Sequence, residues 1–492
     1  MLNSVEVTAE GLRFDATALD DSFGVRLTQS SSWFELCRVR PTSRPVFYRV
    51  DYGRLDWGTD LAAFAPAESP PVDPGALVSY VHGGTPAPDR SPLPGVRTLT
   101  LGTTVRLDAR GIVVTPSPPA VPPASADLAT AVGHMLEAQP AGYAVAYSGG
   151  LASAFLAACA LQVGHRPVLV HADLGPASSA KPLPVVPGLR IERLSIDLSE
   201  LLDHDRMTGF ELAPPLPDIE VPRLMAERLA QHIGAPLVGG MLIEDLVSVK
   251  LPQVDTGLRG WRLLGCEPFH IAGVLPSLEA ARTLLDKKVV YSPPGGAGVP
   301  LVAKQQLKVP PAPSPTGVSN LPGLTEQGRE AFESTRRGAM AMWKEHLEAM
   351  PPVLARLVAG LEERGDGGMA APALDPGVIA AVAAIPARDV GRIRSGVFQN
   401  QLPLHQLVDR HRIVGVRRAS SGHWLRLAAA HHLRRERRKI IAQLDRESSL
   451  GDLGLFDPRA LQATLRDGRD LADHALPLLR MLWLDRWLRG RT

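Results

Sequence analysis

The chain has 492 residues, of which 45% are hydrophobic and 21% are charged, and its formal net charge is +2. That length suffices for two or three domains with separate cores, and the composition is typical of globular proteins. The nearly neutral charge gives no bulk electrostatic reason to expect nucleic-acid binding. The three cysteines, Cys37, Cys159 and Cys266, are far apart and odd in number, which excludes a disulfide framework and a cysteine pair for zinc.

The start of the chain, MLNSVEVTAEGLRFD, lacks a basic region followed by an apolar run, so we expect no signal peptide. No stretch of about 18 apolar residues occurs, so no membrane span is predicted. We therefore expect a soluble, cytoplasmic protein.

Residues 1–115 predict a β-rich domain with alternating patterns and turn signals. Its expected strands are 46–50, 54–57, 98–107 and 112–114, the first two forming a hairpin around Asp-Tyr-Gly. An Asp-Pro-Gly start predicts a short helix over 73–80. The proline-rich segment 116–124 predicts a stiff, extended linker.

Residues 125–492 predict an α/β domain that ends in helices. Helices over 128–139 and 151–163 alternate with short apolar strands at 144–147 and 167–171. Strand, turn, helix and strand in that order form a βαβ unit, which implies a doubly wound parallel sheet. The proline-rich segment 304–323 predicts a mobile surface loop, and helices follow from residue 324 onward.

The turn Ser148-Gly149-Gly150, with Ser153 in the helix that follows, is the strongest functional signal. Backbone N–H groups in such a turn and the positive end of the helix form a cradle suited to pyrophosphate. The alternative is a tight strand-to-helix turn without a ligand. Asp173 ends the second strand, where doubly wound sheets bind ligands, so it could bind ribose or metal, or cap a helix.

The loop resembles the SGGxDS pyrophosphate loop of ATP-pyrophosphatases, and the chain resembles the asparagine synthetase superfamily along its length. Residues 44–64 and 76–108 resemble the later part of the class II glutaminase (Ntn-type) domain, and 371–386 resemble the family's proline-flanked Leu-Asp segment. Residues 444–461 and 479–491 resemble one subgroup, the lasso-peptide macrolactam cyclases.

This resemblance implies ATP- and Mg²⁺-dependent adenylation of an Asp or Glu side chain in a precursor peptide, whose own N-terminal amine then closes the ring. It implies a leader-binding protein and a leader peptidase as partners, but no nucleic acid. The expected pyrophosphate contacts are Ser148, Gly149, Gly150 and Ser153, and Glu244 or Asp245 is expected to bind Mg²⁺. Candidates for late charge stabilisation are Arg417, Arg418 and His423.

Several residues depart from the family's pattern. Ala152 replaces the loop's Asp, and Ile243 replaces the Asp of a GxGxDE motif matched to 239–244; a one-residue shift would make Asp245 the surviving carboxylate. Ser421 stands where a Lys is expected. Leu2 replaces the catalytic Cys of glutaminases, so glutamine hydrolysis is not expected. These departures leave two alternatives open: a catalytically silent scaffold that binds a peptide or an active cyclase, and adenylate chemistry without the usual metal pair.

Four further features of the sequence each have a structural interpretation as well as a functional one. Asp218 and Glu220 could lie over the site or in a solvated loop. The basic run 434–439 could bind an acidic leader peptide, ATP phosphates or a nucleic acid, or form a solvated helix face. His431 and His432 lack a third ligand at metal spacing. Trp483 and Trp487, spaced i and i+4, are expected to be core anchors.

Overall fold

The computed structural model describes residues 2–490 apart from 9–10, 16–22, 43–44, 66–71, 85–88, 176–181, 204–215, 249–320, 365–367, 395–396, 417–422, 447 and 469–470. Most of the predicted loop 304–323 therefore lies outside the described residues, as do Arg417, Arg418 and Ser421.

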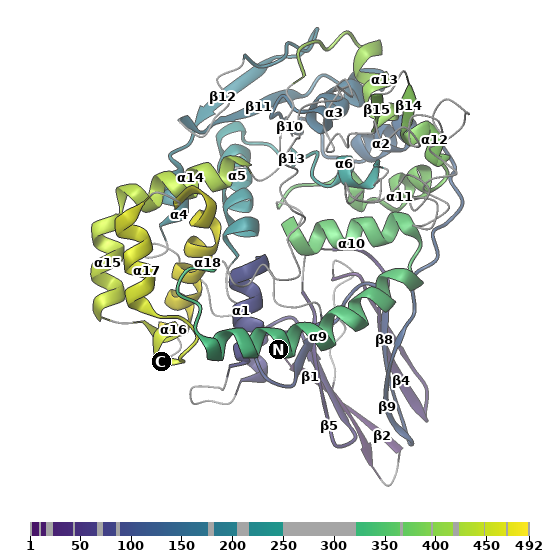
Figure 1. Ribbon diagram of the computed structural model, residues 1–492. Helices are drawn as coiled ribbons and strands as arrows, with labels where there is room; N and C mark the ends of the chain where they lie inside the picture. Colours follow the sequence, from purple (N-terminus) through teal and green to yellow (C-terminus); the bar gives the residue numbers. More distant parts are fainter. Residues whose placement is uncertain are drawn as a thin grey trace.

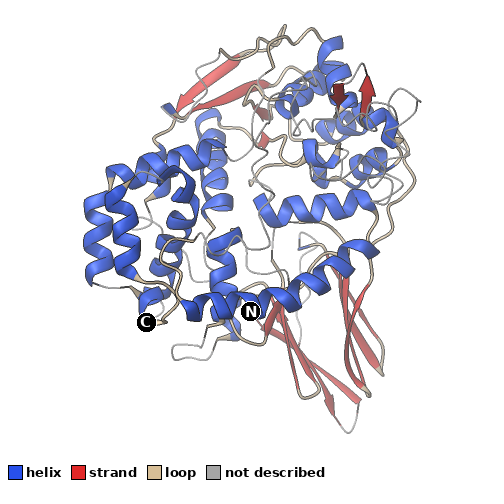
Figure 2. Cartoon of the chain, in the orientation of Figure 1, coloured by secondary structure: helices blue, strands red, loops and turns tan. Residues whose placement is uncertain are grey.

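Two antiparallel sheets form the first part of the chain (Figures 1 and 2). One has the order β2-β1-β6-β5-β7, with β1 Leu2–Thr8, β2 Gly11–Asp15, β5 Phe47–Asp51, β6 Arg54–Gly58 and β7 Val96–Thr98. The other has the order β3-β4-β8-β9, with β3 Val25–Gln29, β4 Trp33–Arg38, β8 Thr103–Asp108 and β9 Gly111–Pro116. Their shared core includes Phe34 stacked on Trp57, with ring centroids 4.8 Å apart.

The predicted hairpin is confirmed as β5 paired with β6. Its turn places Tyr52 and Gly53 at φ of 30° and 82°, which is the left-handed backbone of a tight hairpin turn. A 3-10 turn, η2 (Leu61–Phe64), follows β6. The predicted short helix is α1 (Pro74–Gly83), and the Asp73 side chain caps it by accepting from the Ala76 N–H at 3.0 Å.

Four parallel strands form the central sheet in the order β12-β11-β10-β13. They are β10 (Ala144–Ala146), β11 (Val168–Asp173), β12 (Ile191–Ser195) and β13 (Leu237–Val238). The connecting helices are α3 (Leu151–Gln162), α4 (Leu198–Leu202), α5 (Pro217–Ile233) and α6 (Ile243–Leu246), and α2 (Leu128–Glu137) precedes β10. The expected mixed α/β class with a parallel sheet and a helical C-terminal region is thereby confirmed.

Different helices cover the two faces of this sheet. Val145 and Leu169 belong to the core that contains α2 and α3, whereas the neighbouring residues Ala144 and Val170 belong to the core that contains α5. This alternation follows from the two-residue period of a strand. Because both faces are covered, the strands are apolar on both sides.

Helices predominate after residue 324. The longer ones are α9 Glu326–Ala349, α10 Pro352–Arg364, α11 Pro376–Ala383, α13 Leu402–Arg410, α14 His423–Arg435, α15 Arg437–Arg446, α17 Pro458–Asp467 and α18 Leu471–Arg489. Short elements between them are η7 Pro372–Leu374, α12 Ala387–Val390, β14 Arg392–Arg394, β15 Val397–Gln399 and α16 Ser449–Asp452. No helix among the described residues is long and apolar enough to cross a membrane.

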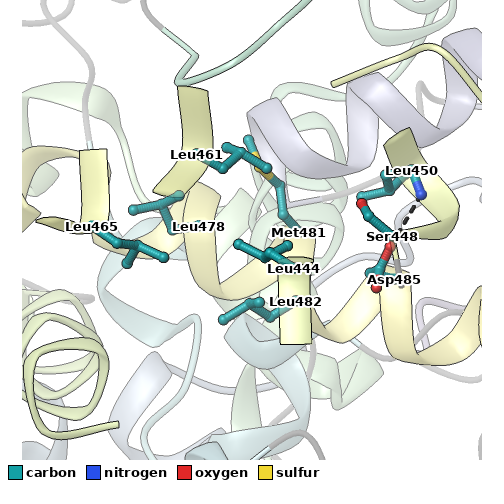
Figure 3. Close-up of a pocket in the computed structure, with 9 residues that line it drawn as sticks. All are labelled: Leu444, Ser448, Leu450, Leu461, Leu465, Leu478, Met481, Leu482 and Asp485. Atoms are coloured by element: carbon teal, nitrogen blue, oxygen red, sulfur yellow. Dashed lines mark hydrogen bonds between the residues drawn. The ribbon is translucent and has the colours of Figure 1, made fainter. Parts of the chain in front are cut away.

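Trp483 and Trp487 of α18 are confirmed as core residues, with exposed fractions of 0% and 2%. Beside them, α15, α16, α17 and α18 surround a hollow of about the size of one water molecule (Figure 3). The carboxylate of Asp485 lies at one end and accepts from the Leu450 N–H at 3.0 Å. This bond fixes the start of α16 against α18.

Asp218 and Glu220 do not lie in a loop, because they form the first turn of α5. Two parallel hydrogen bonds of 2.7 and 2.8 Å join the Asp218 carboxylate to the guanidinium of Arg480 in α18. Arg223, one turn further along α5, pairs with Glu220. The solvated-loop reading is therefore wrong, and Asp218 has a structural partner.

Candidate functional site

The loop after β10 has the backbone expected of an anion cradle. Gly149 has a φ of 74°, which favours glycine, and Gly150 caps α3 without a side chain. Ser148 is exposed; its Oγ accepts from the Gly150 N–H at 3.2 Å and lies 3.3 Å from the Oγ of Ser153. Ser153 in turn donates its hydroxyl to the Gly150 carbonyl at 3.0 Å. These bonds hold the turn open at the start of the helix.

The first N–H groups of α3 are the chemically important part of this loop. Helix geometry leaves such groups without an internal acceptor, and they carry the positive end of the helix dipole. The Ala152 N–H donates to the Oε1 atom of Glu244 at 3.0 Å. The N–H groups of Leu151 and Ser153 have no acceptor among the described residues. The loop therefore keeps free donors for an anion.

The loop lies where the strand order of the sheet reverses. From β10 the chain proceeds to β11 and β12 on one side and then returns to β13 on the other side. Ligands of open α/β sheets bind in the crevice outside the carboxyl ends of the strands at such a point. The segments that follow β10 and β13 are in close contact at this point, because a Cβ at Gly240 would come within 2.8 Å of the Ala152 Cβ.

Glu244 and Asp245 lie in the short helix α6, directly after β13. Ile243, which stands at the expected Asp, is completely buried in the core. Glu244 contacts the start of α3, because its Oε1 atom accepts from the Ala152 N–H. Among the residues that the structure describes, no group of three or more His, Cys, Asp or Glu side chains could hold a metal ion. Glu244 and Asp245 alone therefore do not make a complete magnesium site.

Two residues that sequence reasoning missed hold α6 in place. Gln401 donates its Nε2 to the Glu244 carbonyl at 2.9 Å, and Arg356 donates its Nη2 to the Leu246 carbonyl at 3.2 Å. Gln401 is completely buried and has a φ of 57°, an unusual backbone for a non-glycine residue. Neither residue belongs to a motif, and each lies more than a hundred residues away from α6.

His171 is a third neighbour of the loop that the sequence did not single out. Its Nδ1 lies 2.8 Å from the Tyr147 carbonyl and therefore donates a hydrogen bond to the residue before Ser148. A histidine near the carboxyl end of a buried strand is the signal that could have drawn attention to it. Asp173, at the end of the same strand, accepts from the Gly175 N–H at 3.1 Å, which is a local turn contact.

The predicted residues for late charge stabilisation cannot be placed relative to this loop. Arg417 and Arg418 lie outside the described residues, and His423 begins α14 but its side chain is not described. Burial raises the pKa of the Cys159 thiol in α3, so this cysteine stays protonated and cannot act as a nucleophile.

No protein-family model matches the chain, and no curated protein matches it significantly.

Proposed function

We propose that this chain is an ATP-dependent, AMP-forming amide ligase that closes a macrolactam ring on a ribosomally made peptide. The observation that supports the proposal most is the start of α3, where the N–H groups of Leu151 and Ser153 have no acceptor in the part of the chain that the structure describes and lie beside the exposed Ser148 hydroxyl. A helix start at a switch point favours the phosphates of a nucleotide. The resemblance to asparagine synthetases and lasso-peptide cyclases supplies the class of reaction.

In this reaction a side-chain carboxylate of the peptide attacks the α-phosphate of ATP, giving an acyl-adenylate and releasing pyrophosphate. The peptide's N-terminal amine then attacks the acyl carbon, and AMP leaves. AMP is a good leaving group, so the protein needs to orient the reactants and to stabilise phosphate and oxyanion charge.

A precursor peptide, a leader-binding protein and a leader peptidase are the partners that this proposal implies. The N-terminal sheets would be a glutaminase-like domain without its catalytic cysteine.

A second candidate function is a catalytically silent scaffold that binds a peptide or an active cyclase. One observation favours it: Glu244 is hydrogen-bonded to the Ala152 N–H, where a phosphate oxygen would otherwise bind. Ala152 offers no carboxylate of its own for a metal. Under this reading the chain keeps the fold of a synthetase but has lost turnover.

Calorimetry with millimolar ATP and an assay for AMP and pyrophosphate distinguish the two. The ligase proposal expects nucleotide binding in the wild type, weakened by Ser148→Ala, and release of AMP and pyrophosphate with Mg²⁺ and a suitable peptide. Ser31→Ala is the matched control, because Ser31 is exposed and distant from the loop in sequence. Nucleotide binding without release of pyrophosphate for any peptide supports the scaffold, and absence of nucleotide binding would contradict the ligase.

A further inference from the structure

Tyr147, the residue directly before the Ser148-Gly149-Gly150 turn, is held by three hydrogen bonds. Its N–H donates to the Val170 carbonyl of β11 at 2.7 Å, and its buried hydroxyl donates to the Pro184 carbonyl at 3.1 Å. Its own carbonyl accepts from the Nδ1 of His171 at 2.8 Å. The chain is therefore fixed in position at the point where the turn begins.

The imidazole of His171 extends the contact between β10 and β11 beyond their backbone pairing. The two strands are paired in parallel up to Ala146 and Val170. After this pair the Tyr147 N–H still bonds to the backbone of β11, whereas the Tyr147 carbonyl bonds to a side chain of that strand. This bond requires a proton on Nδ1, which the charged ring and one of the two neutral tautomers carry. Both polar groups of the Tyr147 backbone therefore point towards β11.

The direction of the Tyr147 carbonyl determines where the Ser148 N–H points. The two groups belong to one planar trans peptide, so they point in opposite directions. β11 lies on one side of β10 and β13 lies on the other (Figure 1). The Ser148 N–H is thus directed to the side of β13. That strand ends at Val238, which is paired with Val145, so β13 stops before it reaches the level of Ser148.

We propose that His171 is a positioning residue that directs the Ser148 N–H towards a phosphate group bound at the switch point between β10 and β13. The inference rests on the proposed function, since it assigns a residue to the same site. A donor that is oriented before the ligand binds needs no reorganisation when negative charge arrives, which strengthens its electrostatic effect. In this role His171 acts through the peptide group between Tyr147 and Ser148 and not by contact with the anion.

Calorimetry with inorganic pyrophosphate tests this role. His171→Leu removes the donor to the Tyr147 carbonyl, so we expect pyrophosphate to bind about tenfold more weakly than in the wild type. His171→Asn carries an amide nitrogen on Cγ, as Nδ1 is, and should stay within about threefold of the wild type. His171→Gln places its nitrogen one bond further away and should resemble His171→Leu, for which it substitutes if the leucine variant does not fold. His134→Leu, at an exposed histidine of α2, is the control and should bind as the wild type does.

Hydrogen exchange at the Ser148 amide separates positioning from a purely structural role. At saturating pyrophosphate this amide should exchange more slowly in the wild type and in His171→Asn, but not in His171→Leu or His171→Gln. A purely structural role would lower the urea midpoint and leave this protection intact in the saturated variants. Equal pyrophosphate affinity in the wild type and these two variants, or equal protection of Ser148, overturns the inference alone. A wild type that binds neither pyrophosphate nor ATP overturns the proposed function as well.

Discussion

At the scale of single residues, the segments that follow β10 and β13 pack together through Ala152 and Gly240. A Cβ added at Gly240 would lie 2.8 Å from the Ala152 Cβ and 3.0 Å from its carbonyl carbon. Because those neighbours include backbone, Gly240→Ala must push the loops of β10 and β13 apart. We expect it to lower the free energy of unfolding by about 1–3 kcal/mol, measured by urea denaturation.

Gly83→Ala is the control for this substitution. A Cβ at Gly83, the last residue of α1, meets nothing within 4 Å, so its effect should stay within about 0.5 kcal/mol. Equal urea midpoints for the two variants would show that the loops of β10 and β13 are not tightly packed.

His346 is a single residue that makes the free energy of unfolding depend on pH. Burial lowers the pKa of this histidine, partly offset by the hydrogen bond that its Nε2 donates to the Leu101 carbonyl at 2.7 Å. The unfolded histidine titrates at about 6.5, so between the two pKa values the unfolded state binds more protons. The contribution of His346 to stability is therefore complete above the unfolded pKa and falls as pH decreases towards the folded pKa.

Urea midpoints at about pH 7.5 and about pH 5 measure this loss. His346→Gln keeps a donor for Leu101 but does not titrate, so its midpoint should change less between the two pH values than that of the wild type. Part of the dependence remains in the variant, because burial also lowers the pKa of His405 and of His411. An unchanged pH dependence in His346→Gln would contradict the assignment.

At the scale of elements, Arg480 joins three helices. It pairs with Asp218 at the start of α5 and donates to the carbonyls of Val81 and His82 in α1. Arg480→Met leaves the largely buried carboxylate and these carbonyls without a donor, and we expect a loss of about 3–5 kcal/mol in unfolding free energy. In a double-mutant cycle with Asp218→Asn, the coupling should be about 1–3 kcal/mol.

The matched control for Arg480 is Arg223→Met. Arg223 pairs with Glu220 and Glu227 along α5, but its side chain is 39% exposed, so we expect a cost below about 1 kcal/mol. Similar losses for the two arginines would mean that burial of the Arg480 pair adds nothing to its strength.

Local elements of this fold could be predicted from the sequence, whereas long-range partners could not. The β5–β6 hairpin, α1 and the β10–α3–β11 unit follow from turn residues, caps and periodicity, all of which act within a few positions. Asp218 was misjudged because its partner Arg480 lies 262 residues away.

The residues of the candidate site also fall into a locally predictable group and a long-range group that the sequence does not predict. The Ser148-Gly149-Gly150 turn could be predicted from its own residues, because two consecutive glycines favour a tight turn. The structure places this turn at the start of α3. Arg356 and Gln401 have no such signal, because they act on α6 through carbonyl groups that any sequence would supply. Sequence motifs identify residues that contact a ligand more readily than residues that only support those ligand contacts.

At the scale of the whole molecule, α1 follows the N-terminal strand β6 in the chain but belongs to the core of the C-terminal helices. This helix packs against α9 and α18, and seven consecutive residues of it are buried. A Cβ at Gly75 would lie 1.8 Å from the Thr335 Oγ1 and 2.6 Å from the Ala331 carbonyl oxygen. The contact between α1 and α9 thus requires glycine at position 75. Because α1 lies between β6 and β7 in the chain and packs among the C-terminal helices, we expect the sheets and helices to unfold together.

Gly75→Ala tests this coupling. We expect it to lower the urea midpoint of the whole chain, and in hydrogen exchange at increasing urea the amides of β5–β6 and those of α18 should lose protection at the same concentration. Gly83→Ala, on the same helix but with open space around it, should leave both unchanged. Protection that persists in β5–β6 after α18 has exchanged would show that the sheets are an independent unit, because α1 would then have left the helical core without unfolding the strands on either side of it.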